Sequence, residues 1–137
     1  MPPETSNYGI DTSVFVRLLT GHPEPDFTKT TKALERLFAE KAAAQLFVSN
    51  QVIGEAYITL QHFYEISKAD ARKAMLALFS AGAVQPLNGH AVIEILEKTT
   101  GAGLLDRLIA QEYTARDFEV LTNDKRMARL DGCQLLK

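Results

Sequence analysis

The feature that most constrains the fold is the first apolar run of the chain, which ends at an acidic residue. Residues 8–10 have the pattern of a short buried strand, and Asp11 follows directly. Residues 14–19 then have the pattern of a first helix, with Thr12 or Ser13 as its N-cap. In an open parallel sheet, ligands bind outside the carboxyl ends of the strands. A carboxylate at this place is well positioned to hold a cation.

Strand and helix patterns alternate along the rest of the chain. Short apolar runs predict strands at residues 46–48, 83–85, 119–121 and 134–136. Helical spacing and capping residues predict helices at residues 28–43, 50–64, 68–81, 88–98 and 104–115, and one helical turn at 125–130. Ser49 or Asn50 is expected to cap the helix at 50–64, and the helix at 68–81 is expected to start at a capping box headed by Ser67 and to end at Gly82. In the last long helix, Leu105, Leu108 and Ile109 are expected to face inward. The alternation predicts an α/β fold with a central parallel sheet of four to five strands, covered on both faces.

Length and composition narrow the class of protein. A chain of 137 residues without a repeat or linker is expected to form one domain, 1–137, with residues 1–7 as a flexible tail and residues 20–26 as a loop. The formal charge of −2 provides no global basic field for coating nucleic acid. The single cysteine, Cys133, excludes an internal disulfide and zinc patterns of paired cysteines. Without a signal-peptide pattern or a membrane-spanning run, we expect a cytoplasmic protein.

Four acids stand where side chains are available for chemistry. Asp11 and Asp124 follow predicted strands, whereas Glu55 and Asp106 interrupt apolar helical stretches near helix starts. Clustered carboxylates raise one another's pKa, so such a cluster persists only when a cation neutralises it. Oxygen ligands without cysteine or histidine suit Mg²⁺ or Mn²⁺. If the four acids cluster, they imply metal-assisted hydrolysis of a phosphodiester.

Each acid also has a purely structural interpretation. Asp11 fits an N-cap as well as a ligand, and Glu55 continues a polar helical stripe that includes Gln51. Asp106 lies in a first helical turn, where an acid favours the helix dipole, and Asp124 fits the cap of a turn. Periodicity alone does not show that the four acids meet.

The segments around these acids also carry a resemblance to a known family. They are Ile10-Asp11-Thr12-Ser13-Val14-Phe15-Val16-Arg17-Leu18-Leu19, Val52-Ile53-Gly54-Glu55, Asp106-Arg107-Leu108-Ile109-Ala110 and Val120-Leu121-Thr122-Asn123-Asp124-Lys125. In order and spacing they resemble a PIN domain of the VapC-type toxin group, over nearly the whole chain. The resemblance implies a three-layer α/β/α sandwich with an acidic pocket at the carboxyl ends of the strands.

The resemblance also implies an activity and a set of site residues. PIN domains of this group are Mg²⁺- or Mn²⁺-dependent endoribonucleases that cleave RNA, often as the toxin half of a toxin–antitoxin pair. They commonly form homodimers and bind a small antitoxin protein. The positions that match the family's catalytic, metal-binding quartet are Asp11, Glu55, Asp106 and Asp124. The positions that match its supporting polar residues are Ser13 and Thr122.

Basic residues near these motifs are candidates for holding the phosphates of RNA. Arg107 departs from the family pattern, which usually has a small residue after the third acid. The full set of candidates is Arg17, Arg107, Lys125, Arg126 and Arg129. The alternative for each is a solvated surface position or an ion pair.

Rival functions on a similar sheet lack their required residues. A receiver domain needs two adjacent acids after its first strand, and a haloacid-dehalogenase-like phosphatase needs an aspartate where Ser13 stands. No Walker loop is present. The remaining alternative is a PIN-fold module that binds nucleic acid or protein with weak or no nuclease activity.

Overall fold

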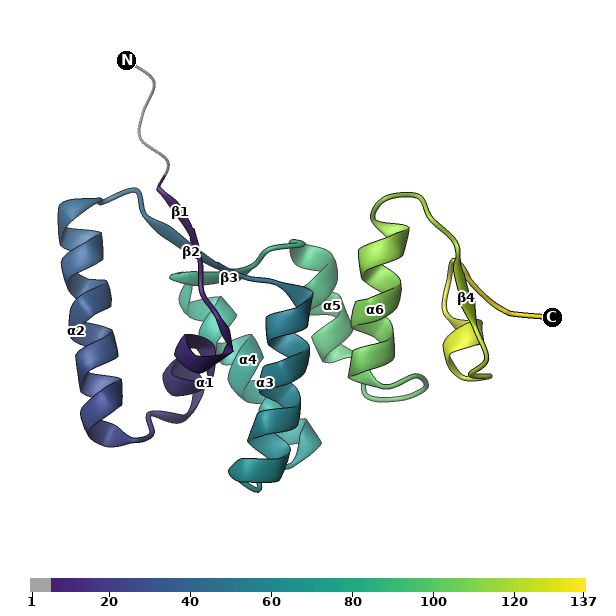
Figure 1. Ribbon diagram of the computed structural model, residues 1–137, viewed down its shortest axis with the longest axis horizontal. Helices are drawn as coiled ribbons and strands as arrows, with labels where there is room; N and C mark the ends of the chain where they lie inside the picture. Colours follow the sequence, from purple (N-terminus) through teal and green to yellow (C-terminus); the bar gives the residue numbers. More distant parts are fainter. Residues whose placement is uncertain (1–5) are drawn as a thin grey trace, which may run out of the picture. The chain divides into compact units, whose positions relative to one another are not determined.

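The structure, a computed structural model, describes residues 6–137 (Figure 1). These residues divide into two compact units, one up to Leu87 and one from Asn88 to Lys137. The N-terminal unit contains a three-stranded sheet and the C-terminal unit a two-stranded sheet. Every strand pairing in both sheets is parallel. No helix among residues 6–137 is long and apolar enough to cross a membrane.

The N-terminal unit is built on strands β1 (Asn7–Gly9), β2 (Gln45–Val48) and β3 (Val84–Pro86), with β2 in the middle. Leu46 is the register partner of Tyr8 on one side and of Val84 on the other. The helices that connect or follow these strands are α1 (Thr12–Thr20), α2 (Glu24–Glu40), α3 (Asn50–Phe63) and α4 (Lys68–Ala81). Helix α1 packs against α2, α3 and α4.

The core of this unit joins the sheet to three of the helices. Its largest fully buried side chains include Phe15 of α1, Leu46 of β2, Leu60 of α3 and Met75 of α4. The ring of Phe15 stacks on that of Phe79, with 5.9 Å between the centroids. These contacts hold the start of α1, and therefore Asp11 just before it, against the sheet.

Two helix starts follow local chemistry that the sequence predicts. The hydroxyl of Ser49 accepts a hydrogen bond from the amide of Val52, and that of Ser67 accepts one from the amide of Asp70. Helix α4 ends at Gly82, whose φ of 93° suits glycine. These caps and this helix end are confirmed.

Several boundaries differ from the prediction, three of them near the start of the chain. The N-cap of α1 is Asp11 and not Thr12 or Ser13. Helix α2 begins at Glu24, inside the predicted loop, because a proline in the first helical turn loses no hydrogen bond. Strand β1 begins at Asn7 and the carbonyl of Ser6 accepts a hydrogen bond from Gln45, so these two positions are not part of a tail. The rest of the expected tail, residues 1–5, lies outside the described residues.

The C-terminal unit contains α5 (His90–Glu97), α6 (Leu104–Thr114), β4 (Val120–Thr122), the 3₁₀ turn η1 (Met127–Arg129) and β5 (Cys133–Leu135). Ala110, Val120 and Met127 form a small buried cluster beside the two strands. In α6, Leu104 and Leu108 are buried, but Leu105 and Ile109 are 37% and 49% exposed. The expectation that Leu105 and Ile109 face inward is therefore wrong, since only one narrow stripe of this helix is covered.

The α/β class is confirmed by the alternation of helices with parallel strands. The described chain contains five strands, as expected, but they form sheets of three and two strands, one in each unit. The strands are only three or four residues long. The organisation as one domain stays a prediction.

Candidate active site

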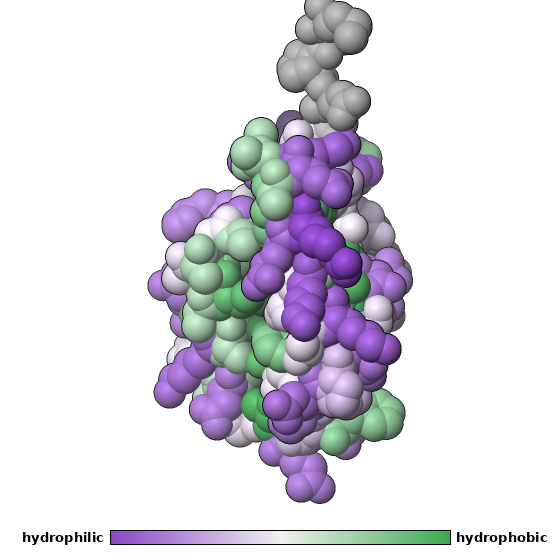
Figure 2. Space-filling model, turned by 90° about the vertical axis from the view of Figure 1, so that its left-hand side faces the viewer, coloured by the Kyte–Doolittle hydropathy of each residue, from purple (hydrophilic) through white to green (hydrophobic). Residues whose placement is uncertain are grey.

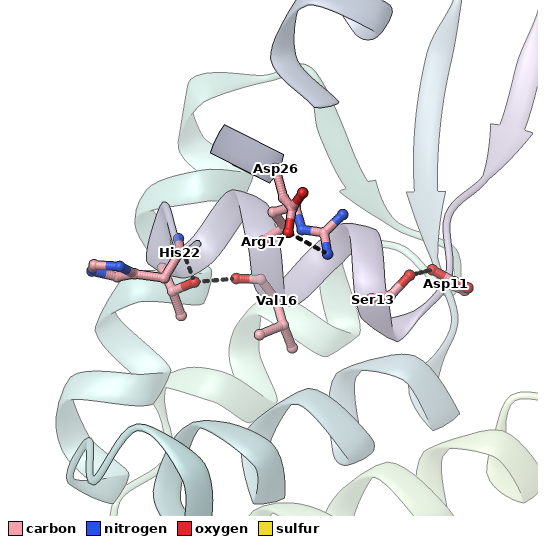
Figure 3. Close-up of polar contacts among 7 residues, drawn as sticks. Asp11, Ser13, Val16, Arg17, His22 and Asp26 are labelled. Atoms are coloured by element: carbon pink, nitrogen blue, oxygen red, sulfur yellow. Dashed lines mark hydrogen bonds and ion pairs between the residues drawn. The ribbon is translucent and has the colours of Figure 1, made fainter. Parts of the chain in front are cut away.

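Asp11 lies between the end of β1 and the first turn of α1. Its Oδ1 accepts a hydrogen bond from the Ser13 hydroxyl at 2.6 Å (Figure 3) and another from the Val14 amide at 3.1 Å. The carboxylate therefore caps the helix, which is the structural interpretation of this residue. Both of these hydrogen bonds go to Oδ1, and the Ser13 amide has a smaller effect on the carboxylate. The cap thus occupies one oxygen, and the other is available to a ligand.

Glu55 lies in α3 and reaches the same end of α1. Its Oε2 accepts a hydrogen bond of 2.6 Å from the Thr12 hydroxyl, and its Oε1 accepts one of 3.2 Å from the Gln51 amide. Thr12 directly follows Asp11, so both acids contact the first residues of α1. The structure brings this half of the predicted quartet into one polar cluster: Asp11, Thr12, Ser13, Gln51 and Glu55.

Both carboxylates are tuned toward the ionised form. The Ser13 hydroxyl, followed by the Val14 amide, holds the pKa of Asp11 below its ordinary value. The Thr12 hydroxyl and the Gln51 amide do the same for the pKa of Glu55. Hydrogen bonds donated to a carboxylate favour its charged form. The pair therefore presents two negative charges at neutral pH.

Asp124 follows β4 in the C-terminal unit and is held by the backbone. Its Oδ1 accepts a hydrogen bond of 2.9 Å from the Met127 amide, just before η1. Its own amide donates to the Thr122 hydroxyl at 3.0 Å. Thr122 therefore contacts the main chain of Asp124 and not the carboxylate.

Asp106 lies in the first turn of α6 and is half-buried. Gly103 caps this helix without a side-chain hydrogen bond. Within the described chain the Asp106 carboxylate makes no hydrogen bond or ion pair. Its position thus comes from α6 alone.

The predicted quartet is divided between the two units. Asp11 and Glu55 belong to the N-terminal unit, and Asp106 and Asp124 belong to the C-terminal unit. Among residues 6–137 no group of three or more histidine, cysteine or acidic side chains is placed to hold a metal ion. The quartet as a metal-binding set stays a prediction.

The predicted basic residues have different surroundings. The Arg17 Nη2 lies 3.9 Å from the Asp26 Oδ2, along α1 from Asp11 (Figure 3). Arg107 donates to the carbonyls of Ala102 and Thr100, at 2.9 and 2.8 Å. Lys125 and Arg126 are exposed.

The donor set fits a hard divalent cation. Each carboxylate of the N-terminal pair is exposed and charged, and the hydrogen bonds to it come from neutral groups, apart from a small electrostatic effect of Arg17 on Asp11. Oxygen donors of this kind suit Mg²⁺ and Mn²⁺.

The sequence does not predict that Gln51 and Thr12 donate hydrogen bonds to Glu55. The polar stripe of the helix includes Gln51, but Thr12, 43 residues from Glu55, is predicted only as a helix cap.

The fold and the acids together define an α/β protein with two carboxylates, Asp11 and Glu55, beside the start of its first helix. The model of the PIN domain family matches residues 8–132, and the chain therefore belongs to this family. PIN domains are generally nucleases and typically depend on a divalent metal ion.

Other known proteins add little to this assignment. No curated protein matches the chain. Among solved structures, it is similar to the crystal structure of VapBC2 from Rickettsia felis bound to a DNA fragment from their promoter. The identity is 20%, the match covers 95% of this chain and 97% of that chain, and the TM-score is 0.40. A TM-score of this size supports no conclusion beyond the likeness itself.

Proposed function

We propose that the chain is a Mg²⁺- or Mn²⁺-dependent endoribonuclease and the toxin component of a type II toxin–antitoxin pair. Membership of the PIN domain family supports a nuclease, and the VapC-type motifs in the sequence support RNA as its substrate. The observation that carries the proposal is the pair Asp11 and Glu55, which two hydroxyl groups hold at the start of α1.

The proposed ligands of the metal ion are the four acids Asp11, Glu55, Asp106 and Asp124. A bound divalent ion polarises the scissile phosphate and an attacking water, and it stabilises the leaving oxygen. The chain itself contributes carboxylate oxygens that are oriented before a metal ion binds. Ser13 orients the Asp11 carboxylate, and Thr12 orients that of Glu55.

A protein partner and a second copy of the chain are also part of the proposal. Helix α2 has no buried residue, although it is amphipathic. Figure 2 shows the side of the molecule on which α2 lies, with green apolar side chains among purple hydrophilic ones. Phe63 at the end of α3 is 81% exposed. Apolar side chains of this kind suit an antitoxin helix or a homodimer contact in the cytoplasm.

The test is cleavage of a labelled mixed RNA pool by purified chain, free of antitoxin, in Mg²⁺, in Mn²⁺ and in EDTA. Asp11→Asn and Glu55→Gln remove one ligand charge each, and Glu35→Gln on the exposed face of α2 is the matched control. We expect cleavage that requires metal, disappears in both site variants and persists in the control.

Two results contradict the proposal. Absence of cleavage in either metal, by folded wild-type chain, favours the binding-module alternative. Cleavage that is unchanged by Asp11→Asn and Glu55→Gln rules out the proposed site.

A further inference from the structure

The C-terminal unit contains a hollow of about 600 Å³. Its lining combines the link between α5 and α6 with residues around η1. Three of the lining residues are arginines, Arg107, Arg126 and Arg129, and no acidic residue lines the hollow within the described chain. We call it the arginine pocket.

Arg107 is fixed at one wall of this pocket. Its Nε and Nη2 donate to the carbonyls of Ala102 and Thr100, both of which line the hollow. A Cβ added at Gly101, where φ is +81°, would lie 3.1 Å from the Arg107 Nη2. Two neutral carbonyls hold the guanidinium but leave its charge uncompensated. Arg107 is therefore a rigid positive charge.

The link itself adds donors and no negative charge. Among residues 6–137, the amides of Thr100, Gly101 and Ala102 make no hydrogen bond. Their carbonyls at 100 and 102 are already occupied by Arg107. The exposed side chains of Arg126 and Arg129 add two further guanidinium groups to the lining. Uncompensated guanidinium groups beside free N–H donors select an anion with several oxygens.

We propose that the arginine pocket binds backbone phosphates of the RNA substrate, through a lining that contains none of the four proposed metal ligands. This assignment rests on the proposed function for the identity of the polyanion. RNA is favoured over a single free anion because the hollow is open and wide, and three guanidinium groups exceed what one phosphate needs. The pocket positions RNA without reading its sequence.

The test measures binding and cleavage separately. Binding of a fluorescein-labelled, mixed-sequence 20-nucleotide RNA is followed by anisotropy in EDTA at several KCl concentrations. The variant is Arg126→Gln with Arg129→Gln, which leaves Arg107 and the link intact. The control is Arg36→Gln with Arg116→Gln, which removes two exposed arginines that do not line the pocket. Thermal melting checks that both double variants fold.

The pocket variant is expected to bind RNA roughly 10-fold more weakly, and its log–log salt slope is expected to be smaller by about 1.4, or about 0.7 for each phosphate contact to a single strand. The control variant is expected to show smaller changes in both the affinity for RNA and the salt slope. In Mg²⁺, KM for cleavage is expected to rise while kcat stays unchanged.

Three outcomes overturn the assignment, and a fourth separates it from the proposed function. If RNA binding weakens equally in both double variants, the attraction comes from the general charge of the chain and not from the pocket. If RNA binding is unchanged in the pocket variant, the pocket does not bind RNA, and metal-dependent cleavage would still support the proposed function. Displacement of RNA from wild-type chain by a poly-glutamate peptide as effectively as by unlabelled RNA indicates an acidic protein segment as occupant. Pocket-dependent RNA binding without any cleavage supports the pocket and contradicts the proposed nuclease.

Discussion

The two halves of the predicted quartet are supported in different ways. Asp11 and Glu55 each accept a short hydrogen bond from a neighbouring hydroxyl, from Ser13 and Thr12 respectively. Asp124 is held by a backbone amide, and Asp106 accepts no hydrogen bond in the part of the chain that the structure describes. Side-chain neighbours therefore tune the first pair, whereas the backbone alone places the second.

The largest expected effect is the loss of a ligand charge. Asp11→Asn should lower kcat/KM by more than the roughly 100-fold that the loss of an outer-sphere partner costs. Asparagine is as good an N-cap as aspartate, so the melting temperature should stay close to that of wild type. RNA cleavage assays and calorimetry measure the two quantities. If Asp11→Asn lost activity because it unfolded, its melting temperature would fall, and the expected loss of activity without loss of stability would be contradicted.

Thr12→Val tests the side-chain support of the first pair. The substitution removes the 2.6 Å hydrogen bond to Glu55 and keeps the shape of the side chain. Activity should fall by roughly 10- to 100-fold, as for other residues that orient a metal ligand. Thr28→Val, at an exposed position of α2, is the control. Wild-type activity in Thr12→Val would show that Glu55 needs no orientation.

Asp11→Ala separates the cap from the ligand. Alanine at an N-cap costs about 1 kcal/mol, so the free energy of unfolding should fall by that amount relative to Asp11→Asn. Urea denaturation of the two variants measures the difference. Equal stability would mean that the hydrogen bond to the Val14 amide contributes nothing.

Thr122→Val should have a smaller effect than Thr12→Val. The Thr122 hydroxyl accepts from the Asp124 amide at 3.0 Å and does not contact the carboxylate. Loss of one such hydrogen bond is worth about 1 kcal/mol, or roughly fivefold in activity if the loop moves. Comparison of kcat/KM for the two valine variants provides the measurement. A larger effect at Thr122 would reverse the contrast between the two pairs.

The smallest expected effect concerns pH. The lowered pKa values of Asp11 and Glu55 mean that the unfolded chain binds protons at a higher pH than the folded chain. Their contribution to stability is therefore fully present above the ordinary carboxyl pKa of about 4 and is lost as the pH falls below it. Ser13→Ala raises the pKa of folded Asp11 toward its unfolded value, so this variant should lose less stability on acidification than wild type, whereas exposed Ser80→Ala should lose as much as wild type. Thermal melting between pH 3 and 6 measures the loss in each variant.

Local chemistry explains which parts of the fold the sequence predicts. Ser49 and Ser67 cap their helices, and Gly82 ends one, because these features depend on a few adjacent residues. The exposure of Leu105 and Ile109 was not predictable, because helical spacing does not say which side another element covers. The division of five short strands into two sheets depends on pairing between distant segments.

The candidate site shows the same limit. The sequence predicts each of the four acids because the motif around it consists of adjacent residues. The hydrogen bond between Thr12 and Glu55 joins residues 43 positions apart, and no periodicity connects them. Arg107 contacts backbone carbonyls, which carry no sequence signature.

We propose that all four acids, although they are supported differently, are ligands of one metal ion. Free Mn²⁺ measured by electron paramagnetic resonance, in titrations of wild-type chain and of Asp11→Asn, Glu55→Gln, Asp106→Asn and Asp124→Asn, tests it directly. We expect each of the four variants to bind Mn²⁺ more weakly than wild type and the control Glu35→Gln to bind it as wild type does. Wild-type binding by Asp106→Asn and Asp124→Asn, beside weakened binding by the other two, would contradict it.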